Sequence, residues 1–311
     1  MTIGIIGRSE FTYESMILAI DKGHDIAFIV TSKQAPEYKY TSKDFEDFAK
    51  KINVPFFHDP NINSEKLIQV VEDTKPDICI SVNYSGIISK NVISLFPFGI
   101  LNAHAGDLPK YRGNACQAWA IINKEEKIGL CIHKMIGGEL DSGNIIARNY
   151  FDLNINSRIS EIFIWMETQI PILMMEAITK LKINPLYVLD IQSKNEKDIL
   201  RTYPRLPEDG LIKWNKESEE IVRLINASSE PFSGAFTFFK NKKVIVWRAE
   251  KINCNERFLG IPGQISNINK DDGSVEVLTG NCQKIKILEV EIENIRDVPS
   301  HFIKSLRSRL R

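Results

Sequence analysis

The stretch that decides both the fold and the candidate site is Leu101-Asn102-Ala103-His104-Ala105-Gly106-Asp107-Leu108-Pro109-Lys110-Tyr111-Arg112-Gly113. It places the amide of Asn102 two residues before the imidazole of His104, just ahead of a turn that contains proline. An aspartate follows in Glu139-Leu140-Asp141-Ser142-Gly143. An amide can donate hydrogen bonds to an oxyanion, an imidazole can accept a proton, and a carboxylate can orient the imidazole and favour its protonated form. Asn102, His104 and Asp141 are therefore candidate catalytic residues for acyl transfer to an amine.

The residues before this stretch alternate short apolar runs with segments of helical spacing. Strands are predicted at residues 3–6, 25–30, 54–57, 77–82 and 99–102, and helices at residues 10–22, 42–52, 64–72 and 89–95. Such alternation implies βαβ units and an α/β fold with an open, mostly parallel Rossmann-like sheet. Ligands of these sheets bind beyond the carboxyl ends of the strands. Asn102 falls at such an end, and His104 is expected in the loop that follows.

A second, smaller region is predicted towards the C-terminus. A helix at 119–123, strands at 127–135 and 144–150, and a helical stretch at 156–182 interrupted near Pro171 complete the first region. The polar link 194–209 predicts the boundary between a catalytic domain at 1–200 and a β-rich C-terminal domain at 201–311. That domain should contain a helix at 216–227 and short strands at 236–239, 244–249, 263–267, 274–278 and 284–290. A basic helical end is expected at Lys304, Arg307, Arg309 and Arg311.

Composition excludes several classes of function. Among 311 residues, 40 basic side chains balance 40 acidic ones, so there is no general electrostatic attraction to nucleic acid or to an anionic membrane. The start lacks the basic segment of a signal peptide, and no apolar run approaches the roughly 20 residues that span a bilayer. A cytoplasmic protein is expected. The five cysteines form no CxxC pair and are expected to be buried free thiols, as is usual in a reducing compartment: Cys79, Cys116, Cys131, Cys254 and Cys282.

Two kinds of ligand site are not supported. Gly4-Ile5-Ile6-Gly7 resembles half of a dinucleotide fingerprint, but the GxGxxG pattern is missing and no acidic residue ends the second strand, so NAD binding is not expected. The remaining histidines lack a carboxylate or thiol at metal-ligand spacing, so no metal site is predicted from His24, His58, His133 and His301.

The chain resembles the folate-dependent formyltransferase family, and this resemblance covers nearly its whole length. The family pattern is matched in order and spacing by Asn102-Ala103-His104, Leu108-Pro109, Tyr111-Arg112-Gly113, Trp119-Ala120-Ile121 and Asp141-Ser142-Gly143. The segment from Arg205 to Trp214 is similar to the entry into the family's C-terminal domain. One departure is that the family's Ser-Leu-Leu-Pro turn is Gly106-Asp107-Leu108-Pro109 here.

The resemblance implies a donor and residues that bind it. The donor is N10-formyltetrahydrofolate, and the reaction needs no metal. The family holds the pterin between this turn and the loop after the fourth strand, which predicts cofactor binding by Tyr84, Ile87, Ile88, Asp107, Leu108, Pro109 and Gly138. Phosphate or the folate glutamate could be bound by Lys110, Arg112 and Lys134, and a pyrophosphate could be reached by Arg201 and Arg205 in the linker.

The acceptor is less constrained by the resemblance. Family members formylate methionyl-tRNA, glycinamide ribonucleotide or nucleotide-linked amino sugars. The C-terminal region argues against glycinamide ribonucleotide, whose enzymes are single domains. Residues 32–40 are short and mixed in charge, and the total charge is balanced, which disfavours tRNA. A sugar-nucleotide acceptor is therefore expected. The resemblance to members that use such acceptors further implies glycan biosynthesis and a homodimer. A methionyl-tRNA formyltransferase and a non-catalytic folate- or carrier-binding module remain the alternatives.

Overall fold

The computed structural model describes residues 1–59, 61–253 and 256–311, and the chain forms two compact units. The N-terminal unit contains Met1–Cys116, Ile128–Phe151 and Phe163–Tyr203, and the C-terminal unit contains Gln117–Lys127, Asp152–Ile162 and Pro204–Arg311. The chain passes for the last time from the N-terminal to the C-terminal unit after Tyr203, within the polar link 194–209. Two earlier segments belong to the C-terminal unit, so each unit is discontinuous in sequence.

The N-terminal unit is built on a seven-stranded sheet. Its strand order is β3 (Phe56–His58), β2 (Asp25–Thr31), β1 (Thr2–Gly7), β4 (Ile78–Val82), β5 (Ile100–His104), β7 (Lys127–Lys134) and β8 (Ile145–Asp152). The first five strands are parallel, and β7 runs antiparallel to β5. The predicted mostly parallel Rossmann-like sheet is thus confirmed. Because β1 to β5 share a direction, their carboxyl ends meet at one edge.

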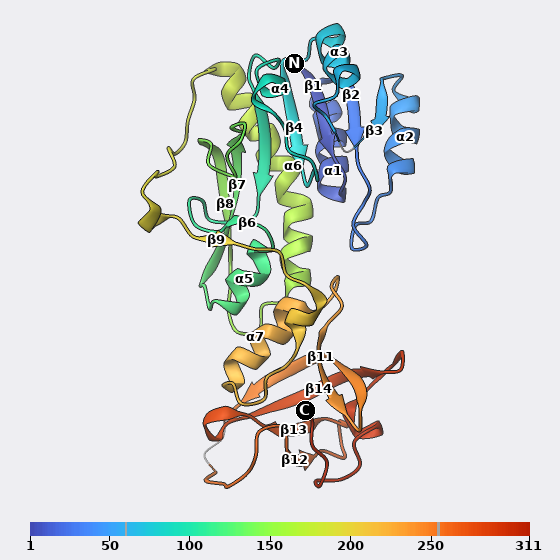
Figure 1. Cartoon of the computed structure of the whole chain (residues 1–311), viewed down its shortest axis with the longest axis vertical. Helices are drawn as coiled ribbons and strands as arrows, with labels where there is room; N and C mark the ends of the chain where they lie inside the picture. Colours follow the sequence, from blue (N-terminus) through green and yellow to red (C-terminus); the bar gives the residue numbers. More distant parts are fainter. Residues whose placement is uncertain (60, 254–255) are drawn as a thin grey trace. The chain divides into compact units, whose positions relative to one another are not determined.

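Helices cover both faces of this sheet (Figure 1). On one face, α3 (Glu65–Thr74) and α4 (Lys90–Ile93) pack with β2, β4 and β5 in one apolar cluster. On the other, Phe11 of α1 (Glu10–Asp21) contacts Phe163 of α6 (Ile159–Ile183), and Tyr13 of α1 contacts Phe45 of α2 (Ser42–Lys51). The chain leaves α1 through Gly23, whose φ of +77° is the left-handed conformation expected after a helix C-cap.

Helix α6 differs from the prediction in two ways. It continues through Pro171 without interruption. A proline removes one backbone hydrogen bond, but buried apolar residues recur at helical spacing on both sides of it: Ile162, Met166, Ile170, Met174 and Ile178. By length and composition α6 could also cross a membrane, so the expectation that no segment approaches this limit was wrong. Half of its apolar window is buried inside the structure, as in the core helices of proteins that do not enter a membrane.

The C-terminal unit contains the predicted smaller β-rich fold. Helix α7 (Ser218–Ser228) precedes an antiparallel sheet of order β10 (Ala235–Phe239), β11 (Lys242–Ile252), β14 (Lys284–Ile292), β13 (Val275–Leu278) and β12 (Ile265–Ile268), and β15 (Ile295–Asp297) pairs with β14. Its core joins one face of α7 to the inward side chains of these strands, including Ile225, Val246 and Ile287.

Short elements complete both units. They are α5 (Cys116–Ile122), the paired strands β6 (Arg112–Gly113) and β9 (Arg201–Thr202), and the 3-10 helices η1 (Glu196–Asp198), η2 (Pro207–Gly210), η3 (Gly280–Cys282) and η4 (Pro299–His301). Neither β6, β9 nor β15 was predicted, because strands of two or three residues have too few positions to show a period.

The predicted basic helix at the C-terminus was wrong. Residues 302–311 contain no helix; the backbone N–H of Arg311 donates to Phe238 and the N–H of Phe238 donates back to Arg311. The burial of Leu310 in the core of the C-terminal unit holds this segment extended along β10. Burial of one side chain together with two backbone hydrogen bonds therefore overrides the weak electrostatic preference of basic residues for a helix end.

Most of the cysteine prediction is confirmed. Cys79, Cys116 and Cys131 are buried free thiols, but Cys282 is exposed. Cys254 lies outside the described residues.

Candidate active site

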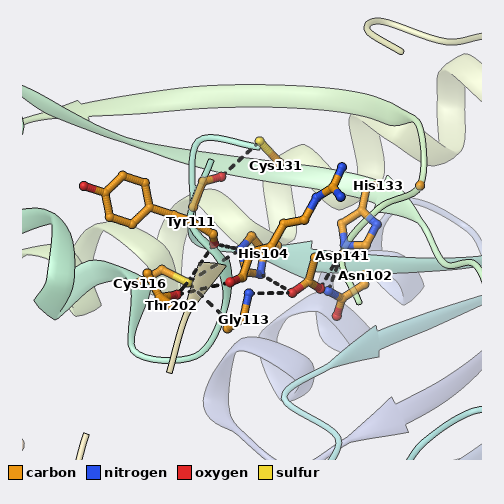
Figure 2. A network of polar contacts seen from close by, with 12 residues as sticks. Asn102, His104, Tyr111, Gly113, Cys116, Cys131, His133, Asp141 and Thr202 are labelled. Carbon is orange, nitrogen blue, oxygen red and sulfur yellow. Dashed lines mark hydrogen bonds and ion pairs between the residues drawn. The ribbon is translucent and has the colours of Figure 1, made fainter. Parts of the chain in front are cut away.

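The three candidate catalytic residues lie together at the carboxyl end of β5 (Figure 2). Asn102 and His104 are alternate residues of this strand and so point to the same face. His104 is the last residue of β5, rather than the loop residue that was expected. Asp141 comes from the loop between β7 and β8 and places Oδ2 3.5 Å from Nδ1 of His104. All three belong to the N-terminal unit.

The orientation of His104 is fixed by the turn that follows it. Its Nε2 lies 2.6 Å from the carbonyl oxygen of Tyr111, and a carbonyl only accepts, so Nε2 carries a proton and donates. Gly106 makes this approach possible, because a Cβ there would lie 2.6 Å from both Nε2 and the Tyr111 oxygen. With Nε2 committed to the turn, Nδ1 is the nitrogen that faces Asp141.

Asp141 is held in an unusual backbone conformation by several contacts. Its φ of +48° is left-handed, which costs a residue with a side chain about 1–3 kcal/mol and is observed mainly where the surroundings enforce it. The backbone N–H of Gly113 donates to Oδ2 at 3.0 Å, and the backbone carbonyl of Asp141 accepts from the side chain of Gln192 at 2.8 Å. The loop therefore presents the carboxylate to His104 in a defined position.

The electrostatics of the pair favour its charged form. Burial alone would lower the pKa of His104, but the negative charge of Asp141, with the Cys116 thiol and the Tyr111 carbonyl, raises that pKa to about 9. Burial would raise the pKa of Asp141, but His104, His133 and the Gly113 N–H lower it to about 2. At neutral pH the site thus contains an imidazolium beside a carboxylate.

A second histidine joins the site, and the sequence analysis missed it. The pairing of β5 with β7 places His133 directly opposite Asn102. Its Nε2 is 3.1 Å from Nδ2 of Asn102 and 3.5 Å from Oδ1 of Asp141, and its Nδ1 donates to the Lys134 carbonyl at 3.1 Å. The sequence signal was a polar residue, His133, near the end of an otherwise apolar strand. Its partner could not be found without the antiparallel register, which the parallel pattern did not suggest.

The cluster of Asn102, His104 and Asp141 lines a cavity of about 380 Å³. Four of the seven predicted folate-binding residues line it together with Asn102, His104 and Asp141; they are Tyr84, Ile87, Ile88 and Gly138. The loop that contains Tyr84 is pinned by Asn63, whose amide donates to the Ile87 carbonyl at 2.7 Å. Ile87 is 82 % exposed, so its apolar side chain is open to contact at the cavity.

The remaining three predicted folate-binding residues do not line this cavity. Leu108 is buried in an apolar cluster with Cys131 and Ile145. Asp107 accepts from the Tyr150 hydroxyl at 3.1 Å, and Pro109 follows a cis peptide bond. The turn thus contributes to the site mainly through the Tyr111 carbonyl and the Gly113 N–H.

Most of the basic residues considered for phosphate have partners inside the protein. Arg112 donates to Gln192, and Lys134 lies 3.5 Å from the Pro185 carbonyl, with its pKa lowered by burial. Arg205 packs over Trp119 and donates to the Ala227 carbonyl within the C-terminal unit. Lys110 is exposed, and Arg201 lies against Tyr203. Among the described residues, no group of His, Cys, Asp and Glu could hold a metal ion.

Comparison with known families identifies two matching regions. Residues 3–178 match the family model described as formyl transferase, and residues 206–307 match the model described as formyl transferase, C-terminal domain. A bifunctional polymyxin resistance protein ArnA from Wigglesworthia glossinidia brevipalpis is 28% identical over 99% of this chain. The chain spans 47% of the length of that relative. The chain therefore belongs to the formyl transferase family, as expected from the sequence.

The solved structures that share this fold include a complex with a sugar nucleotide and a methionyl-tRNA formyltransferase. An N-formyltransferase from Helicobacter canadensis, in complex with folinic acid and dTDP-3-aminofucose, matches with a TM-score of 0.67, 16% identity, and coverage of 92% of this chain and 98% of its own. A methionyl-tRNA formyltransferase from Clostridium thermocellum matches with a TM-score of 0.57, 17% identity, and coverage of 90% and 100%. At these identities the likeness shows the fold alone.

Proposed function

Because the chain belongs to the formyl transferase family, we propose that it moves a formyl group from N10-formyltetrahydrofolate to the amine of a nucleotide-linked amino sugar. The observation that supports this most is the convergence of Asn102, His104 and Asp141 on one wall of a single cavity. These side chains supply the hydrogen-bond donors and the proton carrier that transfer of an acyl group to an amine requires.

The shape and lining of the cavity suit a reduced folate. Its volume lies in the range of about 300–1,000 Å³ that is usual for small-molecule sites. Ile87 and Ile88 supply apolar surface, Gly138 leaves space, and the ring of Tyr84 lines the wall beside them. The Helicobacter canadensis enzyme, with a similar fold, was crystallised with folinic acid, which supports a folate donor.

The choice of acceptor depends on electrostatics and on relatives. A tRNA partner is recognised through many phosphates, but the chain has a net charge of zero. The connection between β2 and α2, residues 32–41, is short and contains both signs of charge. The dTDP-3-aminofucose in the Helicobacter canadensis complex is a sugar nucleotide. Together these favour a sugar-nucleotide acceptor over methionyl-tRNA.

In the proposed mechanism His104 begins protonated, since Asp141 stabilises its charge. Imidazolium Nδ1–H and the amide of Asn102 donate hydrogen bonds to the formyl oxygen, on which negative charge develops as the neutral amine attacks the formyl carbon. His104 therefore acts first as a donor. From the sequence, His104 was expected to accept a proton first.

The proton balance closes through the same residue. As the bond between the formyl carbon and N10 breaks, His104 gives its Nδ1 proton to the departing nitrogen. The neutral imidazole then takes the surplus proton of the former amine, directly or through one water. The products are the formamide and tetrahydrofolate, and His104 returns to its starting form.

Location and assembly are part of the proposal. Three buried reduced thiols suit the cytoplasm, where sugar nucleotides used in glycan biosynthesis are made: Cys79, Cys116 and Cys131. We also propose a homodimer, which light scattering of the purified protein tests directly. A mass near 35.5 kDa, that of one chain, would contradict it.

The deciding experiment is a formyl-transfer assay with N10-formyltetrahydrofolate and a panel of UDP-, dTDP- and GDP-linked amino sugars, with methionyl-tRNA as a parallel acceptor. Turnover on one sugar nucleotide, abolished in His104→Ala, is the expected result. Turnover on methionyl-tRNA alone would overturn the acceptor assignment. Folate binding without transfer to any amine would overturn the whole proposal.

A further inference from the structure

The side chain of Gln192 forms a hydrogen-bonded bridge beneath the active-site loop. Its Nε2 donates to the backbone carbonyls of Asp141 at 2.8 Å and Gly143 at 2.7 Å. Its Oε1 accepts from Nη2 of Arg112 at 2.7 Å and from Nε at 3.1 Å. Two donor protons and two acceptor positions are thus all used, and Gln192 is only 5 % exposed.

The orientation of this amide follows from its partners. Two carbonyl oxygens can only accept, so the NH₂ group of Gln192 must face Asp141 and Gly143. The guanidinium of Arg112 can only donate, so the oxygen must face Arg112. Rotating the amide by half a turn would place oxygen against oxygen and nitrogen against nitrogen. The bridge is therefore specific for glutamine.

The bridge joins the turn that orients His104 to the loop that carries Asp141. Arg112 lies in the turn whose Tyr111 carbonyl orients His104, and Gly113 donates directly to the Asp141 carboxylate. Gln192 donates to the backbone carbonyl of Asp141, a residue whose φ is +48°. The segment around Gln192 is itself anchored, because Asp190 pairs with Ile145 just after the catalytic loop.

We propose that Gln192, oriented by Arg112, is a positioning residue that sets the place of Asp141 relative to His104. This inference rests on the proposed formyl transfer. Gln192 is not among the described residues that line the cavity, and its hydrogen bonds reach the site through the backbone of Asp141. Removing it frees the loop to leave the left-handed conformation, and the carboxylate then moves away from Nδ1.

The test is Gln192→Met, which keeps an unbranched side chain of similar length and removes all four hydrogen bonds. We expect kcat to fall about tenfold to 100-fold, as a displacement of about 1 Å at a catalytic group does, with the KM for the folate changed less than about threefold. Arg112→Met should cause a smaller loss of the same kind. The double variant should lose little more than Gln192→Met alone, because Arg112 acts mainly by orienting the amide; its other side-chain hydrogen bond, to the Ser193 carbonyl at 3.4 Å, holds the same segment.

A second measurement needs no acceptor and separates this inference from the proposed function. The chain has five histidines, so ¹³C-histidine labelling with His104→Ala for assignment allows the imidazole of His104 to be titrated by NMR. Gln192→Met should lower the pKa of His104, because the Asp141 carboxylate lies farther away. If the wild-type chain formylates no amine but this pKa still falls, the proposed function fails and the positioning role stands.

A matched control removes another buried amide that donates to a backbone carbonyl. Asn226→Ala breaks the hydrogen bond from Asn226 to Ile155 in the C-terminal unit. It should lower Tm and leave kcat and the His104 titration unchanged. If Gln192→Met behaves like Asn226→Ala, with a lower Tm only, Gln192 is a structural residue and the inference is overturned.

Discussion

Two aspartates, one in each unit, show how position decides what a carboxylate does. Asp141 in the N-terminal unit and Asp272 in the C-terminal unit both have lowered pKa values. Burial opposes ionisation of Asp141, and two histidines and a backbone N–H overcome it. Asp272 faces solvent, and the hydrogen bonds from Lys286 and Ser274 lower its pKa. A shifted pKa alone therefore does not mark an active site.

The difference lies in what each charge can influence. The side chain of Asp141 is 11 % exposed, so its field acts at low screening on the titratable ring of His104. Asp272 is 44 % exposed, and its partner Lys286 stays protonated at any physiological pH. The proposed chemistry thus belongs to the N-terminal unit, whereas the pair of Asp272 and Lys286 lies at the surface of the C-terminal unit. The following changes test this division.

The largest effect is expected from His104→Ala. Loss of the imidazolium removes an oxyanion donor and the proton carrier together, so kcat should fall by about 100- to 1000-fold or more. Formyl transfer to the acceptor found in the panel measures it. The matched control, His301→Ala, removes an exposed histidine of the C-terminal unit and should keep wild-type turnover. Retention of more than about a tenth of wild-type turnover by His104→Ala would remove it from the mechanism.

A smaller effect is expected from Asp141→Asn. The amide keeps a group that can accept from Gly113 but removes the charge that opposes burial of the His104 imidazolium. The pKa of His104 should then fall from about 9, and turnover at pH 7.5 should drop about tenfold to 100-fold. Asp272→Asn is the control and should change neither quantity. An unchanged His104 titration would contradict the electrostatic account.

The same pair makes stability depend on pH in a defined direction. The folded-state pKa of His104 lies above its ordinary value, so its contribution is fully present below pH 6.5 and is lost as pH rises through about 9. Asp141 has a lowered pKa, so its contribution is present above pH 3.8 and is lost as pH falls through about 2. Wild-type Tm should therefore fall more between pH 6.5 and 9 than Tm of His104→Ala. Parallel curves in calorimetry would show that the pair is not coupled to folding.

Much of the fold and of the catalytic set could be predicted because both depend on local signals. Apolar runs with short helices between them specify parallel strands, and Asn102 and His104 follow such a run within five residues. Strand bounds were displaced mainly where a strand is short, as at β3, whose three residues lie at Phe56–His58. Asn241 lies between two predicted strands and has a φ of +63°, a left-handed conformation that asparagine tolerates in turns.

The missing parts depend on contacts between distant residues. His133 enters the site only through its register opposite Asn102, and Gln192 reaches Asp141 across 51 residues of sequence. No local pattern identifies such partners. The prediction of a helix in the C-terminal segment was wrong for the same reason, since pairing with Phe238 decides the conformation of that segment. The side chain of Leu108, a predicted folate-binding residue, packs inward, because a turn motif indicates backbone shape and does not fix side-chain direction.

The smallest effect, and one confined to stability, is expected from Thr237→Val in the C-terminal unit. The buried hydroxyl of Thr237 accepts from Nε1 of Trp214 at 2.9 Å and donates to the Arg311 carbonyl at 2.8 Å. Valine has the same shape, so the change leaves the Trp214 N–H buried without its acceptor, at a cost of about 1–3 kcal/mol in the free energy of unfolding. Arg311 keeps its hydrogen bond from Phe238.

Denaturant unfolding and the transfer assay measure the two consequences of Thr237→Val separately. Trp214→Phe removes the donor itself, so adding Thr237→Val to it should cost less than Thr237→Val alone. Turnover should be unchanged in all three variants, because the catalytic pair and its supports lie within the N-terminal unit. A kcat that fell in step with stability, measured where the protein is fully folded, would break the division between the units and assign the C-terminal core a part in the chemistry.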